Sequence, residues 1–168
     1  SAYDKGKRSF QGRSYRKDVD AHLEFQERVW TPVKARKKKL PRRVFFIGNH
    51  EHRITRALDL SPELEGTIGL GDLALEDFYD EVVDYNGSTP GTLEIDGVTY
   101  AHFVIAGVSG RPIGGDFQGR SLLAKRHRSV TVGHSHLFDH SIQGRGDGTF
   151  INGLSVGCYQ DYTNDWAG

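Results

Sequence analysis

Two short apolar runs, each ending in a glycine and a polar turn that carries histidine, decide the fold of this chain. The first is Val44-Phe45-Phe46-Ile47-Gly48-Asn49-His50-Glu51, and the second is Ser129-Val130-Thr131-Val132-Gly133-His134-Ser135-His136. A short continuous apolar run that stops at a glycine predicts a buried strand. Ligands usually bind beyond the carboxyl ends of the strands in open α/β sheets, so both turns are candidate site segments.

The residues around these runs predict helices and strands that alternate at first, followed by a region rich in strands. Helices are expected over 18–33, where Pro32 stops the helix, over 51–58, from Ser61-Pro62, over 73–79 with Asp72 as N-cap, and over 121–128. Strands are expected at 82–83, 92–95, 98–101, 130–132, 137–142, 149–151 and 154–156. Asp96-Gly97 suits the tight turn of a hairpin. The predicted fold class is therefore α/β.

Length and composition are those of one globular domain. The chain has 168 residues, of which 36% are hydrophobic and a further 21 are glycine, and this ordinary apolar share excludes a disordered chain. No apolar run approaches the ~20 residues that span a bilayer, so we expect no membrane association. The single cysteine, Cys158, cannot form an internal disulfide, and a reducing compartment, the cytoplasm, is the expected location.

The charge is balanced overall but unevenly distributed. Residues 1–45 hold 14 Lys or Arg and 5 Asp or Glu, whereas residues 57–110 hold 11 Asp or Glu and no Lys or Arg. The run Lys34–Lys39 (KARKKK) permits an anionic partner, although it lacks the interleaved aromatic residues that would strengthen a nucleic-acid signal. The alternative is that the two stretches face one another or are simply solvated.

Three histidines and one asparagine lie on or directly after strand-like runs. His134 and His136 are two positions apart, so their rings share a face in an extended segment, and His102 and Asn49 occupy comparable positions elsewhere. Imidazole with an amide or carboxylate oxygen suits a divalent ion such as zinc, manganese or iron. A lone histidine is more often a hydrogen-bonded core or surface residue, but the set favours a metal site.

These residues resemble, in order, the last three motifs of the calcineurin-like metallophosphoesterases. The family carries Gly-Asn-His-Glu/Asp, a later His, and Gly-His-x-His, and this chain has Gly48–Glu51, His102 and Gly133–His136. The resemblance extends from about Phe10 to Trp166 and is strongest to phage-encoded members, through STPGTLEIDGVTYAH (88–102) and GCYQDY (157–162). It implies the C-terminal part of a two-sheet β-sandwich flanked by helices and, for a phage protein, the cytoplasm of the host cell.

The resemblance also implies a role for each site residue. Asn49, His102 and His134 would ligate one metal ion and His136 the other. His50 would not ligate; it would act on the leaving-group oxygen as general acid or stabilise transition-state charge, and Glu51 would orient it. Apart from the resemblance, the position of Arg53 close to Gly48–Glu51 suggests contact with substrate phosphate, with a surface ion pair as the equal alternative. Two divalent ions, chosen from manganese, zinc, iron and nickel, would activate water and favour in-line displacement.

The chain departs from the family in one respect. The two earlier family motifs, Asp-x-His and Gly-Asp-x-x-Asp, are missing, and they supply most ligands of the first metal and the bridging aspartate. Gly71-Asp72 is no substitute, because it follows Gly48–Glu51 and its next aspartate is Asp77. We therefore expect residues 1–168 to be a single incomplete domain, with an extended arm over 1–15, a core over 16–168 and an incomplete first-metal site. A further segment or partner chain would supply the missing motifs.

The expected function is metal-dependent hydrolysis of phosphoesters. Gly-His-x-His with both histidines is typical of the phosphodiesterase and nuclease branches, which favours phosphodiester or nucleic-acid-type substrates. One alternative is a protein or small-molecule phosphomonoesterase, because protein phosphatases also carry Gly-Asn-His-Glu. The other is a non-catalytic metal-binding or interaction fragment that lacks the front half of the site.

Overall fold

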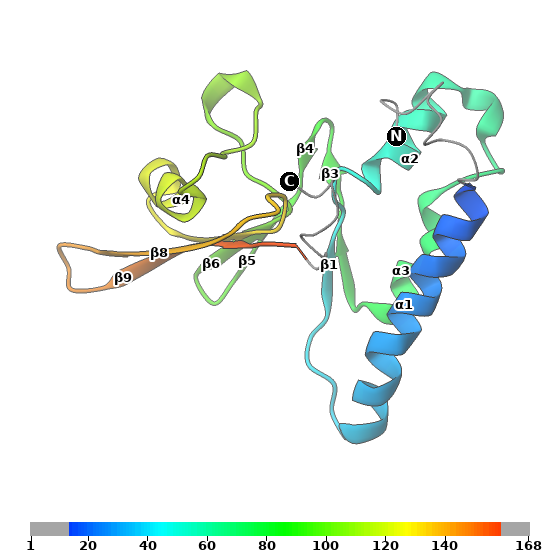
Figure 1. Ribbon diagram of the computed structural model, residues 1–168, viewed down its shortest axis with the longest axis horizontal. Helices are drawn as coiled ribbons and strands as arrows, with labels where there is room; N and C mark the ends of the chain where they lie inside the picture. Colours follow the sequence, from blue (N-terminus) through cyan, green and yellow to red (C-terminus); the bar gives the residue numbers. More distant parts are fainter. Residues whose placement is uncertain (1–13, 159–168) are drawn as a thin grey trace. The chain divides into compact units, whose positions relative to one another are not determined.

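A computed structural model describes residues 14–158 and has mixed α/β structure (Figure 1). The chain divides into two compact units. We call Ser1–Val44 with Ile54–Glu81 the helical unit and Phe45–Arg53 with Val82–Gly168 the sheet unit. Nearly all of the arm predicted over 1–15 lies outside the described residues, and a single domain stays a prediction.

The elements follow one another as a helix, a mixed middle region and a strand-rich end, with 3₁₀ helices labelled η. In chain order they are α1 (Tyr15–Arg36), β1 (Val44–Phe46), α2 (His52–Leu60), η3 (Pro62–Leu64), η4 (Leu70–Leu73), α3 (Leu75–Phe78), β2 (Glu81–Val83), β3 (Tyr85–Asn86), β4 (Thr89–Pro90), β5 (Thr92–Ile95), β6 (Val98–Ala101), η5 (Gly107–Ser109), α4 (Gln118–Arg126), β7 (Ser129–Val132), β8 (Phe138–Gly144) and β9 (Phe150–Val156). Along the described residues, no helix is both long and apolar enough to cross a membrane.

The first helix is longer than its sequence pattern predicts. We expected Pro32 to stop it, but α1 continues through this proline to Arg36, so that prediction was wrong. Proline removes only its own amide donor, and the next turn still closes, because the Lys37 N–H donates to the Val33 carbonyl at 3.1 Å. Buried residues hold the helix in place. One of them is Gln26, whose side-chain oxygen accepts a hydrogen bond from the Tyr79 hydroxyl at 2.9 Å.

The sequence predicted that Asp72 caps a helix over 73–79, and this prediction was wrong. The segment splits into η4 and α3, with Ala74 between them in the left-handed region (φ 46°). The Asp72 carboxylate lies inside η4, where it accepts hydrogen bonds from the Gly69 N–H at 2.9 Å and the Tyr15 hydroxyl at 2.6 Å. Asp72 therefore joins η4 to the start of α1, a long-range contact that local spacing does not reveal.

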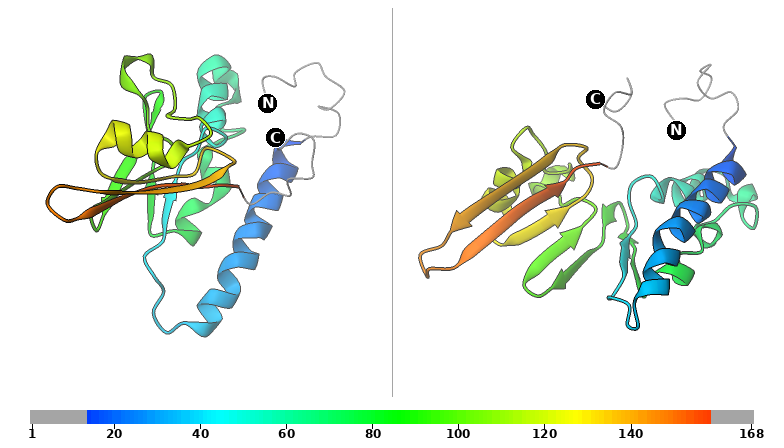
Figure 2. Two further views of the ribbon diagram at one scale, coloured as in Figure 1. Left: turned by 60° about the vertical axis from the view of Figure 1, so that its left-hand side comes forward. Right: turned by 60° about the horizontal axis from the view of Figure 1, so that its bottom comes forward.

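The sheet unit is built on a five-stranded sheet in the order β5-β6-β7-β9-β8 (Figure 2). Its three central strands are parallel, and an antiparallel strand flanks them on each side. The predicted hairpin over 92–101 is confirmed: Ile95 pairs with Val98, and Asp96 and Gly97 have φ values of 50° and 76°. Two successive positive φ values give the turn a twist that matches the strands.

One face of this sheet is covered by α4 (Figure 1). Leu122, Val130 and Val132 are at most 1% exposed in the core between them. The α4 helix and the sheet approach each other closely at Gly119 and Gly153. A Cβ added to Gly153 would lie 2.2 Å from the Gly119 carbonyl oxygen. The predicted break between strands 149–151 and 154–156 was wrong. Gly153 serves this close approach inside one continuous strand, β9.

The start of α4 also depends on a long-range contact. The helix begins at Gln118, earlier than the predicted start at Ser121. The Asp139 carboxylate on β8 accepts a hydrogen bond from the Gly119 N–H at 2.7 Å, which satisfies an amide of the first helical turn. The opposite face of the sheet carries the exposed apolar residues Phe138, Ile142 and Phe150, which are 70%, 62% and 69% exposed.

The contact between Gly119 and Gly153 predicts that Gly153→Ala is destabilising. The new methyl group would lie 2.2 Å from a backbone carbonyl that cannot rotate away. Overpacking of this kind lowers the free energy of unfolding by about 1–3 kcal/mol. Urea unfolding measures the change, with Gly146→Ala as the matched control, because a Cβ there meets nothing within 4 Å. Equal stability of the two variants would contradict the packing described here.

Candidate functional site

The register of two parallel strands brings His102 and His134 together. On the neighbouring strands β6 and β7, Ala101 pairs with Val132, so the residues that follow them leave the sheet at the same edge. The Gly133 N–H donates to the His102 carbonyl at 3.0 Å and extends the ladder by one step. As a result His134 Nδ1 lies 3.1 Å from His102 Nε2, although the residues are 32 positions apart.

Asn49 reaches the same point from the turn after β1. The Ile47 N–H donates to the Val83 carbonyl at 2.9 Å, which fixes the end of the strand. Asn49 Oδ1 then lies 2.7 Å from His102 Nε2. The structure thus brings together three of the sequence-predicted site residues. We call Asn49, His102 and His134 the Asn–His–His cluster.

The contacts within the Asn–His–His cluster cannot all be good hydrogen bonds. His102 Nε2 faces both Asn49 Oδ1 and His134 Nδ1. One ring nitrogen carries either one proton or one lone pair, so it satisfies a single partner at a time. A cation among the three atoms would instead accept a lone pair from each of them. The cluster therefore has the electronic character of a cation site.

Burial keeps the cluster histidines neutral at neutral pH. Desolvation, reinforced by the neighbouring His134 and His50, lowers the pKa of His102 to about 4. Desolvation also lowers the pKa of His134, with smaller contributions from His136 and His50. Neutral imidazole is the form that binds metal ions. The mutual influence also means that His50 and His136 lie within electrostatic range of the cluster.

Phe103 forms an apolar wall beside the two rings. Its ring centroid lies 5.8 Å from that of His102 and 5.0 Å from that of His134, and its side chain is buried. This wall excludes water from the imidazoles and so contributes to the desolvation that lowers their pKa values. Sequence reasoning did not single out Phe103, although its position directly after His102 is a signal that could have identified it.

Gly48 provides space in the Gly48–Glu51 turn. A Cβ added to Gly48 would lie 2.7 Å from Glu51 Oε2 and 3.1 Å from His102 Cε1. The φ of Gly48 does not lie in the left-handed region. Glu51 Oε2 accepts a hydrogen bond from the Gly48 N–H at 2.9 Å, so among the described residues this carboxylate holds the turn and makes no hydrogen bond to His50.

Arg53 lies beside His50. Its Nη1 is 3.5 Å from His50 Nδ1, and Arg53 makes no ion pair among the described residues. Guanidinium can only donate, so this contact favours a lone pair on Nδ1 and the proton on Nε2. His50 is exposed at the rim, and its pKa is lowered by partial desolvation and by Arg53, with Glu51 acting in the opposite direction.

Tyr85 and His52 support the turn from its far side. Their rings stack with centroids 4.0 Å apart and planes 7° apart. The Tyr85 hydroxyl is buried and has no hydrogen-bond partner among the described residues, and desolvation together with Glu51 raises its pKa. Sequence spacing gives no signal for Tyr85, because the stack depends on how β3 meets the start of α2.

The cluster offers ligands for one divalent ion. Within residues 14–158, no group of three or more His, Cys, Asp or Glu side chains is arranged to hold a metal ion. The cluster has two imidazoles, and its third donor is an amide oxygen. Its donor separations of 2.7 and 3.1 Å resemble the roughly 3 Å between adjacent ligand atoms around an ion bound at about 2.1 Å. His136 is the remaining predicted ligand, and one imidazole does not make a second site.

No protein-family model, curated protein or solved structure matches this chain. Function is therefore inferred from the geometry of the site and from the order of its motifs. Neutral imidazoles, an amide oxygen, a ring N–H on His50 and a cationic Arg53 are brought to one sheet edge. Together they can bind a cation and an anionic substrate.

The lowered pKa of His102 predicts acid sensitivity of the metal-free chain. The pKa is about 4 in the folded chain and 6.5 when unperturbed, so between these values the unfolded chain binds a proton that the folded chain excludes. The free energy of unfolding should thus fall as pH decreases from 6.5 towards 4. His102→Gln, which cannot titrate, should flatten this decrease in urea unfolding with a chelator present.

The matched control is His140→Gln, an exposed histidine on β8 whose ring contacts Asn152. This variant should keep the pH dependence of the unsubstituted chain. An identical decrease in the His102→Gln variant would show that His102 is not held in its neutral form by the fold.

Proposed function

We propose that this chain is a metal-dependent phosphoester hydrolase of the calcineurin-like metallophosphoesterase type. The observation that carries the proposal is the Asn–His–His cluster, in which donor atoms 53 and 32 positions apart in sequence lie 2.7 and 3.1 Å from one another. The cluster joins the Gly-Asn-His-Glu turn, the later histidine and the Gly-His-x-His turn. Structural packing alone gives no reason for these motifs to meet.

The proposal includes the two-sheet sandwich of that family. In the sheet unit, α4 lies on one face of the sheet, while Phe138, Ile142 and Phe150 are exposed on the other. An apolar sheet face is normally buried against a second layer, and a second sheet is one such layer. The exposed face therefore supports a sandwich, with the five-stranded sheet as one of its halves.

In the proposed site, the Asn–His–His cluster holds one divalent ion, and His136 contributes to a second. The other ligands of the second ion come from a segment or chain that carries Asp-x-His and Gly-Asp-x-x-Asp. Manganese, zinc, iron and nickel all suit imidazole and oxygen ligands. When bound, such ions neutralise phosphate oxygens and activate water for in-line attack.

His50 and Arg53 act on the substrate. The Arg53 guanidinium faces His50 Nδ1, so the neutral ring donates a hydrogen bond from its Nε2–H to the leaving-group oxygen and stabilises the charge that develops there. Arg53 donates to a non-bridging phosphate oxygen. Glu51 keeps the turn in place through the Gly48 amide, and Phe103 keeps water away from the cluster rings.

Phosphodiesters, including nucleic acids, are the proposed substrate class, on the basis of the paired histidines of Gly-His-x-His. Glu51 at the end of Gly-Asn-His-Glu favours the alternative of a phosphomonoesterase. The presence of ligands for only one ion among the described residues favours a non-catalytic metal-binding module. Metal content and substrate preference discriminate these possibilities.

Metal content tests the division of roles within the site. The purified chain should bind about one Mn²⁺ with useful affinity, because three donors meet at one point. His134→Ala should lose this ion. His50→Ala should keep it, while hydrolysis by the assembled enzyme falls ~10²–10⁴-fold, because His50 acts on the leaving group.

Elemental analysis and manganese titration of the two variants decide this prediction, with His140→Ala as a control that should keep both metal and activity. If His50→Ala loses as much metal as His134→Ala, the assigned role of His50 is wrong. If the unsubstituted chain binds no manganese, the cluster is not a metal site.

Substrate preference tests the reaction class. We expect a bis-aryl phosphate to be hydrolysed faster than the aryl monophosphate in the presence of manganese. The chain should be assayed alone and with a segment that carries the two further motifs, and most activity should require that segment. A clear preference for the monoester would support the phosphatase alternative instead.

A further inference from the structure

The end of α1 and the loop after it carry an exposed run of cations. Lys34, Arg36, Lys37, Lys38 and Lys39 are all exposed. None of them makes an ion pair with another described residue. We call residues 34–39 the basic segment.

Local structure accounts for only part of this charge. Lys34 and Arg36 lie in the last turn of α1, where cations stabilise the negative end of the helix dipole, and Lys34 also lies 5.8 Å from the Phe78 ring centroid. The dipole effect fades beyond that turn, so it does not explain Lys37, Lys38 and Lys39. The helix dipole therefore gives no reason for the positive charge at Lys37, Lys38 and Lys39.

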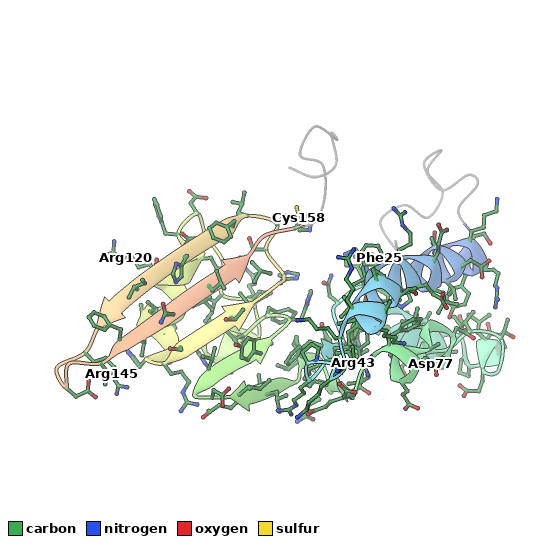
Figure 3. The ribbon with its side chains drawn as sticks, turned by 90° about the horizontal axis from the view of Figure 1, so that it is seen from below. Phe25, Arg43, Asp77, Arg120, Arg145 and Cys158 are labelled. Atoms are coloured by element: carbon green, nitrogen blue, oxygen red, sulfur yellow. The ribbon has the colours of Figure 1, made fainter. Side chains whose placement is uncertain are left out.

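Two neighbouring arginines of the helical unit, Arg42 and Arg43, have a structural role because they form ion pairs. Arg42 pairs with Glu81. Arg43, which is labelled in Figure 3, forms a bidentate pair with Asp80 at 2.7 and 3.2 Å. These pairs hold the segment that leads into β1. Within residues 14–158, the five cations of the basic segment make no such ion pairs, and they repel one another, which an anionic partner would relieve.

We propose that the basic segment is a binding site for the phosphate backbone of duplex nucleic acid, without sequence preference. Lysine ammonium groups suit phosphate oxygens as compact point charges. Residues 33–43 contain no aromatic side chain on which an unpaired base could stack, which favours a duplex over a single strand. No large apolar side chain in residues 34–39 could enter a bilayer, which disfavours a membrane partner.

This site goes beyond the proposed function, because it requires neither a metal ion nor hydrolysis. Contact with phosphates releases counterions, so the logarithm of the binding constant falls by about 0.9 per contacted phosphate for each unit in the logarithm of salt concentration. Non-specific sites of this kind have dissociation constants on the order of 10⁻⁴–10⁻⁶ M at physiological salt. The binding should be weak and strongly dependent on salt.

The test is fluorescence anisotropy of a labelled 24-base-pair duplex of arbitrary sequence, titrated with the full chain in a chelator so that no hydrolysis interferes. The triple variant Lys37→Ala, Lys38→Ala, Lys39→Ala should weaken binding at least tenfold at 100 mM salt. It should also reduce the salt slope by about 2–3, as expected for the loss of three phosphate contacts.

The matched control removes the same charge elsewhere, through Arg120→Ala, Lys125→Ala and Arg145→Ala, of which Arg120 and Arg145 are labelled in Figure 3. These residues are exposed and make no ion pair with a described residue. The control should bind the duplex within about twofold of the unsubstituted chain. Circular dichroism should show unchanged helix content in both variants.

Two results would overturn the proposal. Equal weakening by both triple variants would mean that net charge, not this segment, drives binding. Binding to phosphatidylserine vesicles that depends on Lys37–Lys39, without such dependence for the duplex, would assign the segment to a lipid surface. Because the chelator removes metal from every measurement, neither result bears on the metal content or hydrolysis expected of the Asn–His–His cluster.

Discussion

The parallel pairing of β6 with β7 is the constraint on which the rest of the site depends. It places the residues after Ala101 and Val132 at one sheet edge, and the Gly133 N–H donates to the His102 carbonyl at 3.0 Å. In this register His102 lies beside the Gly133-His134 backbone, and His134 Nδ1 is 3.1 Å from His102 Nε2. The α4 helix packs on the same sheet against β7, β8 and β9, and it approaches β9 closely where Gly119 meets Gly153.

The closeness of the His102 and His134 rings and their removal from water both favour the binding of a cation. Phe103 and the surrounding sheet edge desolvate His102 and His134, so both rings stay neutral and keep their lone pairs available. The same proximity leaves Asn49 Oδ1 and His134 Nδ1 competing for one nitrogen of His102. A cation resolves this competition, and for that reason the cluster, more than any single motif, supports the proposed metal chemistry. Space for the cluster comes from Gly48, whose missing side chain leaves room for Glu51 and His102.

Features encoded within a few residues could be predicted from the sequence. The Asp96-Gly97 turn, the apolar run at Val44–Ile47 and the α/β class all follow from local pattern. Features that depend on a distant partner could not. Asp72 binds Tyr15, which is 57 positions away, and Gly153 contacts Gly119 on α4, so the local pattern shows neither role.

In the site, the residue types and strand ends indicated which residues meet, whereas their supports remained hidden. The stack of His52 on Tyr85 depends on three-dimensional register, because the two residues are distant in sequence. The proposed metal chemistry requires that Asn49, His102 and His134 hold one divalent ion. Anomalous diffraction from crystals grown with manganese tests it most directly. We expect one strong anomalous peak in contact with all three side chains. The absence of a peak there, with manganese bound elsewhere or not at all, would contradict it.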